Sequence, residues 1–266
     1  MKHRALILDF GGVISRTLFE THAITEQALG LPAGTLTWRG PFDPANDALW
    51  RDMQADRISE RDYWLARTRE VGALLGERWD TMETFVQRAR GADVAAVIRP
   101  EAVAAIEGAA TAGCKLAVLS NELDLFYGAG FRDRLPLLQR FDVIVDATHT
   151  GILKPDARAY QACLDQLGLP AASCVFVDDQ LRNVRGALAV GLPTVHFDVM
   201  QPADGFRKAL AVLGLGDVRW QSSGPACPVL LRVPRRRLDR RRLLLYLRKT
   251  GQTTPPLHHH RGVAGF

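Results

Sequence analysis

Four short apolar runs recur along the chain, and each is followed by polar or small residues. They lie at 6–8, 115–119, 143–145 and 174–177, and a further strand signal lies at 193–196. The four runs are continuous in apolar character instead of alternating between apolar and polar positions. Runs of this kind are typical of strands that are buried on both faces of a parallel sheet. The pattern therefore predicts a five-stranded parallel sheet.

Segments with helical signals separate these predicted strands. They lie at 101–112, 156–168, 181–190 and 203–213, and a glycine stands at or just after the end of the last three. Glycine at that place is a common helix stop signal. Strands that alternate with helices predict an α/β fold with right-handed crossovers and helices on both faces of the sheet. We expect a Rossmann-like, doubly wound parallel sheet.

About 100 residues separate the first two predicted strands, which is too long for a simple crossover. Four segments in this stretch have helical character, at 18–30, 45–55, 59–72 and 78–91, and Ser59 is placed to cap the third. We therefore interpret residues 16–96 as an inserted helical subdomain. The α/β core would then comprise residues 1–15 and 97–216.

Composition narrows the class of protein. The chain has 266 residues, with 47% hydrophobic and 24% charged residues, as in an ordinary soluble protein. No segment is apolar over about 18 residues, so we expect no membrane span, and the short apolar run near the start is a core strand, not a signal peptide. Four cysteines show neither metal-ligand spacing nor a disulfide framework. Cys114 and Cys174 are expected to be buried, and the cytoplasm is the expected location.

The charge is unevenly distributed. Residues 232–266 contain 10 of the 34 Lys and Arg residues but only 1 of the 29 acidic residues, so the remaining chain has 24 basic and 28 acidic side chains. A nucleic-acid-binding role is therefore not expected for the body of the protein. The basic tail at 217–266 has three interpretations: a disordered arm for nucleic acid or anionic lipid, an amphipathic helix at 235–249, or non-native sequence such as a frameshifted end.

Polar residues of the types that serve in catalysis or ligand binding follow four of the predicted strands. Asp9 ends the first strand and is followed by Gly11 and Gly12, which leave room for a ligand. Ser120 and Asn121 follow the second strand, Lys154 lies on the loop after the third, and Asp178 and Asp179 end the fourth. Ligands of open α/β sheets bind just beyond the carboxyl ends of the strands. These side chains are therefore expected to form one site.

In this order and spacing, the four segments resemble the four motifs of the haloacid dehalogenase-like hydrolase superfamily over roughly residues 4–214. The resemblance implies a sheet order of 5-4-1-2-3 with Asp9 on the central strand. It implies a Mg²⁺-dependent phosphatase that acts on a small phosphorylated metabolite through an aspartyl-phosphate. It also implies that the helical insertion is a cap that closes over the site, with Phe42, Trp50 and Trp64 as candidates to face it.

The resemblance also assigns roles to individual residues. Asp9 would be the nucleophile, and Lys154 would pair with the phosphate and with Asp9. Asp9, the backbone carbonyl of Gly11 and Asp179 would hold Mg²⁺, with Asp178 as a further ligand or as a bracing acceptor.

Phosphate oxygens would be bound by Ser120 and by backbone N–H groups near Asn121, with Gly11 and Gly12 leaving space for them. We expect Asn183 to brace the last motif, while His22 and His196 have no identifiable partner and are interpreted as structural.

One position departs from the family pattern. Most family phosphatases have a second Asp two residues after the nucleophile, where this chain has Gly11. That Asp protonates the leaving group and later activates water, and such proton transfer is worth about 10²–10⁴ in rate. The protein could therefore be slow, restricted to good leaving groups, served by another acid, or inactive.

Two other functions stay open at this point. A 2-haloacid dehalogenase also uses an Asp nucleophile but needs no metal. A degenerate family member would bind phosphates or a protein partner. The expected assembly is a monomer or a homodimer.

Overall fold

The computed structural model describes residues 4–90, 94–128 and 130–216. Its centre is a five-stranded, fully parallel sheet in the order β3-β2-β1-β4-β5. The strands are β1 (Ala5–Leu8), β2 (Lys115–Ser120), β3 (Val143–Asp146), β4 (Cys174–Asp178) and β5 (Thr194–His196). The predicted parallel sheet and its order, with the first strand in the middle, are confirmed.

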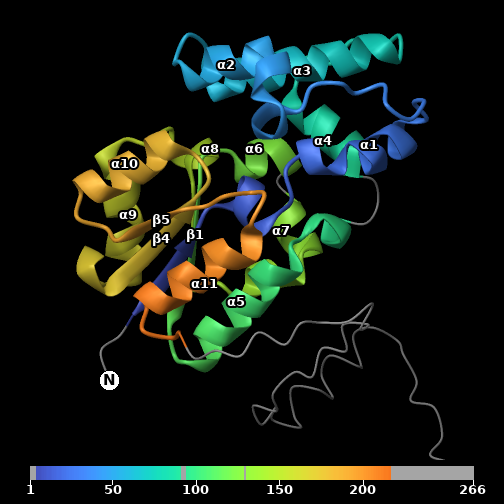
Figure 1. Cartoon of the computed structure of the whole chain (residues 1–266). Helices are drawn as coiled ribbons and strands as arrows, with labels where there is room; N and C mark the ends of the chain where they lie inside the picture. Colours follow the sequence, from blue (N-terminus) through green and yellow to red (C-terminus); the bar gives the residue numbers. More distant parts are fainter. Residues whose placement is uncertain (1–3, 91–93, 129, 217–266) are drawn as a thin grey trace, which may run out of the picture. The chain divides into compact units, whose positions relative to one another are not determined.

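Side chains of β1 alternate between two separate hydrophobic cores. Leu6 and Leu8 belong to the core beneath α5 (Pro100–Thr111) and α11 (Pro202–Val212). Ala5 and Ile7 belong to the opposite core, beneath α9 (Ala157–Leu167) and α10 (Leu181–Ala189). All four strand residues are fully buried. The sheet is thus covered by helices on both faces, as Figure 1 shows, and this explains the continuous apolar runs.

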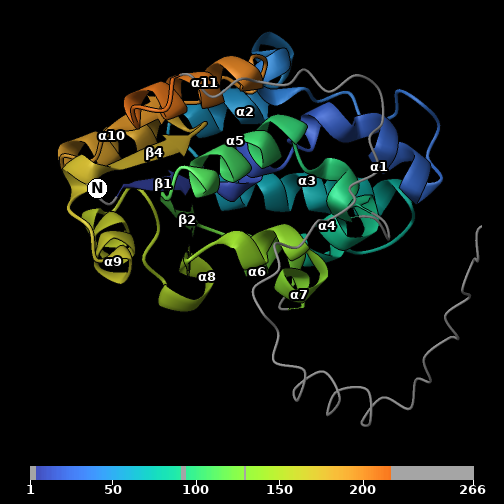
Figure 2. The ribbon, with the colours of Figure 1, turned by 90° about the horizontal axis from the view of Figure 1, so that it is seen from below.

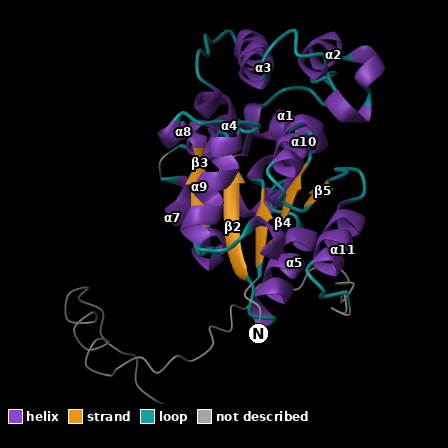
Figure 3. Ribbon diagram, turned by 90° about the vertical axis from the view of Figure 1, so that its left-hand side faces the viewer, coloured by secondary structure: helices purple, strands orange, loops and turns teal. Residues whose placement is uncertain are grey.

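The central position of β1 brings three strand ends together. Leu8 is in register with Val118 of β2 and with Val177 of β4. The residues that follow these positions therefore emerge side by side at one edge of the sheet. The strand arrowheads in Figure 3 all point toward this edge, where the helical insertion lies.

The insertion contains α1 (His22–Leu29), α2 (Ala48–Gln54), α3 (Glu60–Leu74) and α4 (Met82–Arg90), which agree with the four helical segments predicted there. These helices lie beyond the carboxyl ends of the strands, and α4 packs against α6 (Leu123–Tyr127) of the core (Figure 2). The domain boundaries at residues 15/16 and 96/97 stay a prediction. The tail at 217–266 lies outside the described residues.

Several short helices complete the described part of the chain. Beside α6 they include α7 (Phe131–Arg134), α8 (Ala147–Thr150) and a tight helical turn at Phe10–Ile14. Short 3₁₀ turns lie at Phe19–Thr21, Gly40–Phe42, Pro44–Asn46, Val94–Val97, Pro136–Arg140 and Ala171–Ser173. Among the described residues, we find no helix with both the length and the apolar character needed to cross a membrane.

The cysteines in the described part of the chain are free thiols. Cys114, Cys163 and Cys174 are all buried, as expected for Cys114 and Cys174 from their place next to core strands. Burial is the main reason that the pKa of each of these thiols lies above its usual value, so all three stay protonated. They act as small apolar core residues. The cytoplasmic location that the cysteine pattern favours stays a prediction.

Candidate active site

Asp9 stands at the carboxyl end of the central strand. Its backbone N–H donates to the carbonyl of Val177 at 2.9 Å, so the neighbouring strand β4 fixes its position. The chain then turns tightly through Phe10–Ile14, and Gly12 has a φ of +79° within this turn. Asp9 itself is only 9% exposed. The predicted nucleophile therefore lies on a rigid strand end with limited access to solvent.

Lys154 joins two of the carboxylates. Its Nζ lies 2.9 Å from Oδ1 of Asp9 and 2.6 Å from Oδ2 of Asp178. Burial acts to lower the pKa of Lys154, but Asp178 and Asp9 outweigh burial and raise the pKa, so the side chain keeps its charge. The Asn121 side chain holds the loop, because its Oδ1 accepts from the Lys154 N–H at 2.7 Å and its Nδ2 donates to the Lys154 carbonyl at 3.1 Å.

Asp178 is fully buried and surrounded by hydrogen-bond donors. Besides Lys154, it accepts from the Gln180 N–H at 2.8 Å and from Nδ2 of Asn183, which lies 3.1 Å from both carboxylate oxygens. The expected bracing contact of Asn183 is thus present. Of the two roles open to Asp178, this environment favours the bracing acceptor, since both of its oxygens already bind donors of the protein.

Asp179 faces the ligand side of the same cluster. A carboxylate oxygen from each of Asp9, Asp178 and Asp179 lies within 4.8 Å of the others. A Cβ placed on Gly12 would lie 2.7 Å from Oδ2 of Asp179, so only glycine fits against this carboxylate. Gly11 differs, since a Cβ there meets nothing within 4 Å and its φ is −69°.

The cluster holds more negative charge than the protein neutralises. Burial raises the pKa of Asp9 to about 7 although Lys154 acts to lower it, and the charge of Asp178 adds to the rise. Burial and the charges of Asp178 and Asp9 raise the pKa of Asp179 well above its usual value of 3.8. The cluster has three carboxylates, and its one lysine, Lys154, contacts only Asp9 and Asp178. An oxygen-rich group of this kind suits a hard divalent cation, which would relieve the repulsion. The residues present therefore fit a Mg²⁺ site.

Ser120 lies at the end of β2, beside Asp9. Its side chain is 6% exposed, and its Oγ accepts from the Glu122 N–H at 3.3 Å. Ser120, Asn121, Gly11 and Gly12 all line one pocket together with Asp9, Lys154 and Asp179. The strand-end residues chosen from the sequence thus lie around a single cavity, except Asp178, which lies behind it.

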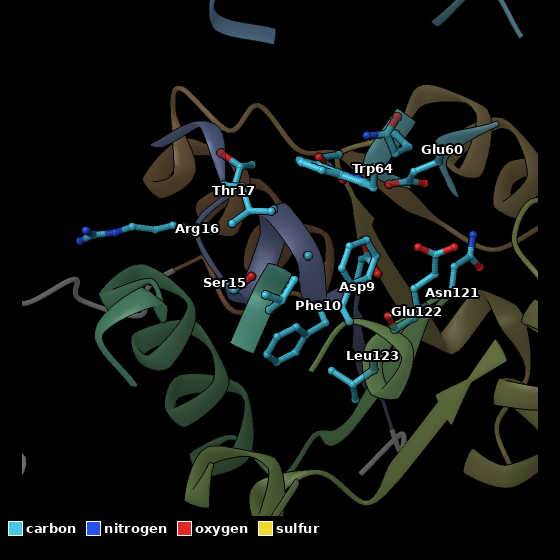
Figure 4. A pocket seen from close by; sticks show the side chains of 18 of the residues that line it. Asp9, Phe10, Ser15, Arg16, Thr17, Glu60, Trp64, Asn121, Glu122 and Leu123 are labelled. Atoms are coloured by element: carbon cyan, nitrogen blue, oxygen red, sulfur yellow. Dashed lines mark hydrogen bonds between the residues drawn. The ribbon is translucent and has the colours of Figure 1, made fainter. Parts of the chain in front are cut away.

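The insertion supplies the other wall of this pocket. Of the three aromatic candidates, Trp50 and Trp64 line it, whereas Phe42 does not and instead packs against the hydrophobic core. Figure 4 shows Trp64 and Glu60 of the insertion across the pocket from Asp9. The remaining lining residues are mainly apolar or aromatic: Phe10, Leu18, Phe19, Pro41, Val86, Leu123, Phe126 and Tyr127.

Sequence analysis missed four charged residues of the pocket. Glu60, Glu122, Arg16 and Arg90 line it, and the first two form ion pairs between the insertion and the core. Nε of Arg61 lies 2.5 Å from Oε1 of Glu122, and Nη2 of Arg182 lies 2.9 Å from Oε2 of Glu60. For Glu122 the sequence does contain a signal of a place in the pocket, because this residue directly follows Ser120 and Asn121 at the end of a predicted strand.

His22 and His196, the two histidines interpreted as structural, lie outside the carboxylate cluster. His22 is buried beside Trp38 in the insertion, and burial lowers its pKa to about 4, so it stays neutral. His196 is exposed, and its Nε2 lies 3.1 Å from the backbone carbonyl of Asp179. This contact gives His196 a partner that the sequence did not identify.

The fold and the site together define an α/β protein whose central parallel strand ends in a buried carboxylate, beside one lysine and two further carboxylates. The model of the haloacid dehalogenase-like hydrolase family matches residues 3–191, and the chain belongs to this family. The resemblance seen in the four motifs is thereby confirmed.

Two named proteins are similar to this chain over most of its length. The chain is 35% identical over 222 residues to phosphatase MT3486 of Mycobacterium tuberculosis, covering 80% of this chain and 96% of that protein. It is 32% identical over 216 residues to mouse acyl-CoA dehydrogenase family member 10, covering 80% of this chain but 19% of the mouse protein. The crystal structure of L-2-haloacid dehalogenase RSc1362 matches 80% of this chain and all of its own with a TM-score of 0.50 at 20% identity, which shows a shared fold.

Proposed function

We propose that this hydrolase is a Mg²⁺-dependent phosphatase that cleaves a small phosphorylated metabolite through an aspartyl-phosphate. One observation carries the proposal: Asp9, Asp178 and Asp179 converge at the strand ends with Lys154 as the cation that contacts two of them. Such a group offers a nucleophile, a cation site and a fixed positive charge within one cavity. The similarity to a protein named a phosphatase supports the same conclusion.

Asp9, Asp179 and the backbone carbonyl of Gly11 would hold the metal ion, with Asp178 fixing Lys154 from behind. When bound, Mg²⁺ would supply positive charge that offsets repulsion between Asp9 and the phosphate oxygens. A metal held by few protein groups leaves coordination positions for the substrate.

The remaining steps belong to the side chains of the chain itself. Asp9 attacks phosphorus in line with the leaving oxygen, because its carboxylate is held at the end of β1 and its second neighbour, Gly11, leaves the approach open. Lys154 keeps Asp9 oriented and offsets the charge of the phosphoryl group. Ser120 and backbone N–H groups near Asn121 would hold phosphate oxygens. Water then attacks the aspartyl-phosphate and returns Asp9 to its free state.

The insertion at 16–96 would act as a cap. Its aromatic residues Trp50 and Trp64 face the pocket and would contact the part of the substrate that is not phosphate. Closure of such a lid excludes water that would compete with the intended chemistry.

Dehalogenation is the alternative that uses the same Asp9. It is favoured by Gly11, which lacks the carboxylate typical of family phosphatases. The three clustered carboxylates favour the phosphatase, because a halide-displacing enzyme gains nothing from a cation site.

Phosphate release separates these functions. We would assay a panel of phosphorylated metabolites and p-nitrophenyl phosphate with and without Mg²⁺, and measure halide release from 2-haloacids in parallel. The proposal expects Mg²⁺-dependent phosphate release that is abolished in Asp9→Asn. Halide release without a metal would establish the dehalogenase, and no turnover of either kind would leave a binding role.

A further inference from the structure

We infer that Glu122 is the general acid–base residue of this site, protonating the leaving oxygen and then activating water. The inference rests on the proposed phosphatase function and specifies how its proton transfers occur. Both steps of phosphate-ester hydrolysis need a proton carrier, and Gly11 has no side chain to provide one. Four properties of Glu122 point to this role.

The first property is its position. Glu122 comes two residues after Ser120, and its N–H donates to the Ser120 Oγ at 3.3 Å. It lines the same pocket as Asp9 and Lys154. Figure 4 shows its side chain rising beside Asn121 toward Glu60 of the insertion. Glu122 therefore stands between the strand-end cluster and the wall that would face the leaving group.

The second property is an oxygen without a partner. Oε1 of Glu122 accepts from Nε of Arg61 at 2.5 Å, whereas Oε2 is buried and has no hydrogen-bond partner among the described residues. The whole residue is only 5% exposed. Leaving a buried polar atom unsatisfied costs about 1–3 kcal/mol, so such atoms call for a functional explanation. A substrate oxygen or a water in the pocket would supply the hydrogen-bond partner that Oε2 of Glu122 lacks.

The third property is its protonation. Burial and the nearby carboxylate of Glu60 raise the pKa of Glu122, while Arg61 and Arg182 lower it, and the balance lies at about 7. Both forms of the side chain are therefore populated near neutral pH. A group that first gives and then takes a proton works best under this condition.

The fourth property is that no other described residue of the pocket is equally suited to carry the proton. Glu60 has its Oε2 bound to Arg182, and Lys154 is committed to Asp9 and Asp178. Asp9 is the nucleophile and Asp179 belongs to the cation site. Among the described acids of the pocket, Glu122 alone has a buried carboxyl oxygen without a hydrogen-bond partner in the protein.

The two steps then balance. Asp9 forms a bond to phosphorus as the bond from phosphorus to the leaving oxygen breaks, and the leaving oxygen takes the electron pair together with the proton of Glu122. The products are an alcohol, the aspartyl-phosphate and a Glu122 carboxylate. That carboxylate next takes a proton from water as the water oxygen attacks phosphorus. The bond to Asp9 breaks, its electron pair returns to the carboxylate, and inorganic phosphate leaves.

A comparison of leaving groups tests this role. The ratio kcat/KM reports the steps through cleavage of the ester bond, and p-nitrophenolate leaves without help from an acid. In Glu122→Gln we expect kcat/KM for an alkyl phosphate to fall about 100-fold or more, and that for p-nitrophenyl phosphate to fall less than about tenfold. Glu107→Gln, an exposed position on α5, is the matched control and should leave both values unchanged.

A second variant tests the same role by adding a carboxyl group to the Glu122→Gln protein, whose remaining activity on p-nitrophenyl phosphate reports that it is folded. Gly11 has ordinary backbone angles and open space beside it, so it accepts a side chain. Adding Gly11→Asp to Glu122→Gln should restore at least tenfold of the lost alkyl-phosphate activity by placing a new carboxyl group next to Asp9.

The outcomes distinguish the two claims. Equal losses for both leaving groups, or no loss, in an enzyme whose wild type is active would overturn the role of Glu122 while leaving the phosphatase intact. A wild-type protein that releases no phosphate from either substrate would overturn the proposed function, and the inference with it.

Discussion

Gly11 and Gly12 are neighbours whose backbone conformations and surroundings differ. Gly12 has a φ of +79° and leaves no room for a Cβ beside Asp179, whereas Gly11 has a φ of −69° and open space. A side chain at Gly12 must therefore both strain the backbone and displace the Asp179 carboxylate of the proposed cation site, while one at Gly11 does neither.

We expect Gly12→Ala to destabilise the protein by about 1–2 kcal/mol and to weaken Mg²⁺ binding at least tenfold. Gly11→Ala should change stability by less than about 1 kcal/mol. Urea unfolding and a Mg²⁺ titration of activity measure both effects. Similar behaviour of the two variants would contradict the packing described for Gly12 and Asp179.

Lys154 is a buried cation between two buried carboxylates. Replacing it in Lys154→Met leaves Asp9 and Asp178 without their shared partner, which should cost about 3–5 kcal/mol and abolish turnover. Lys208→Met is the matched control, because Lys208 forms an exposed pair with Asp204 that is worth less than about 1 kcal/mol. If chemical denaturation gives equal losses for both variants, the buried pairing of Lys154 is not as described.

Activity should titrate with Glu122. As an acid it must be protonated, so kcat/KM for alkyl phosphates should decline as pH rises through about 7. The Glu60 charge raises the pKa of Glu122, and the Arg61 charge lowers it. Glu60→Gln should therefore move the alkaline limb to lower pH, and Arg61→Gln should move it to higher pH. Shifts in the same direction, or none, would argue against Glu122 as the titrating group.

At the residue scale, the sequence predicted the groups that stand at strand ends. Asp9, Ser120, Lys154 and Asp179 could be placed around one site because parallel strands end at one edge of a sheet. Glu122 could not be chosen in the same way. Its role depends on burial by α3 and on the positions of Arg61 and Glu60, which come from contacts more than 60 residues away in the chain.

At the scale of elements, the buried acid Asp47 joins several parts of the insertion. Asp47 accepts from Nη2 of Arg67 at 2.7 Å, from the hydroxyl of Tyr63 at 2.9 Å and from two backbone N–H groups, those of Trp50 and Gly40. Its side chain is completely buried. These bonds join α2, α3 and the loop before α2, and so they fix the wall that carries Trp50 and Trp64.

Removing this acid should loosen the insertion. We expect Asp47→Ala to destabilise the protein by about 3–5 kcal/mol, because Arg67 and Tyr63 lose a buried partner. Asp52→Ala, which breaks an exposed pair with Arg57, should cost less than about 1 kcal/mol. Thermal and urea unfolding compare the two variants, and a small effect of Asp47→Ala would mean that the insertion is held together by other contacts.

The elements themselves were largely predictable. Among the described residues, all five strands and the eight longest helices follow from apolar runs, helix stop signals and the capping box at Ser59 and Asp62. The packing of the insertion was not, since Asp47 reads as an ordinary surface acid in the sequence. The position of Phe42 could not be predicted for the same reason, because an aromatic side chain is compatible with both a pocket wall and a hydrophobic core.

At the scale of the whole molecule, the carboxylate cluster links stability to pH and metal. The pKa of Asp9 is raised from 3.8 to about 7, so the folded state keeps a proton that the unfolded state releases above about pH 4. Stability without metal should therefore fall as pH rises from about 4 to 7, by on the order of 4 kcal/mol from Asp9 alone.

Mg²⁺ should reverse this loss, because it replaces the proton as the neutralising charge. We expect the rise in Tm on adding Mg²⁺ to be larger at pH 8 than at pH 5, measured by thermal unfolding in EDTA and in excess Mg²⁺. Asp179→Asn should reduce this rise. A metal-free protein whose stability increases from pH 5 to 8, or a larger Mg²⁺ effect at pH 5, would contradict a cation site at these carboxylates.

The most direct measurement is the covalent state of Asp9 during turnover. Acid quenching of the enzyme with Mg²⁺ and substrate, followed by mass spectrometry of its peptides, detects a phosphoryl group on the peptide that contains Asp9. Our account predicts that this group appears within one turnover, disappears when substrate is exhausted and is absent in Asp9→Asn. Continued phosphate release with no phosphoryl group on Asp9, or turnover by Asp9→Asn, would contradict it.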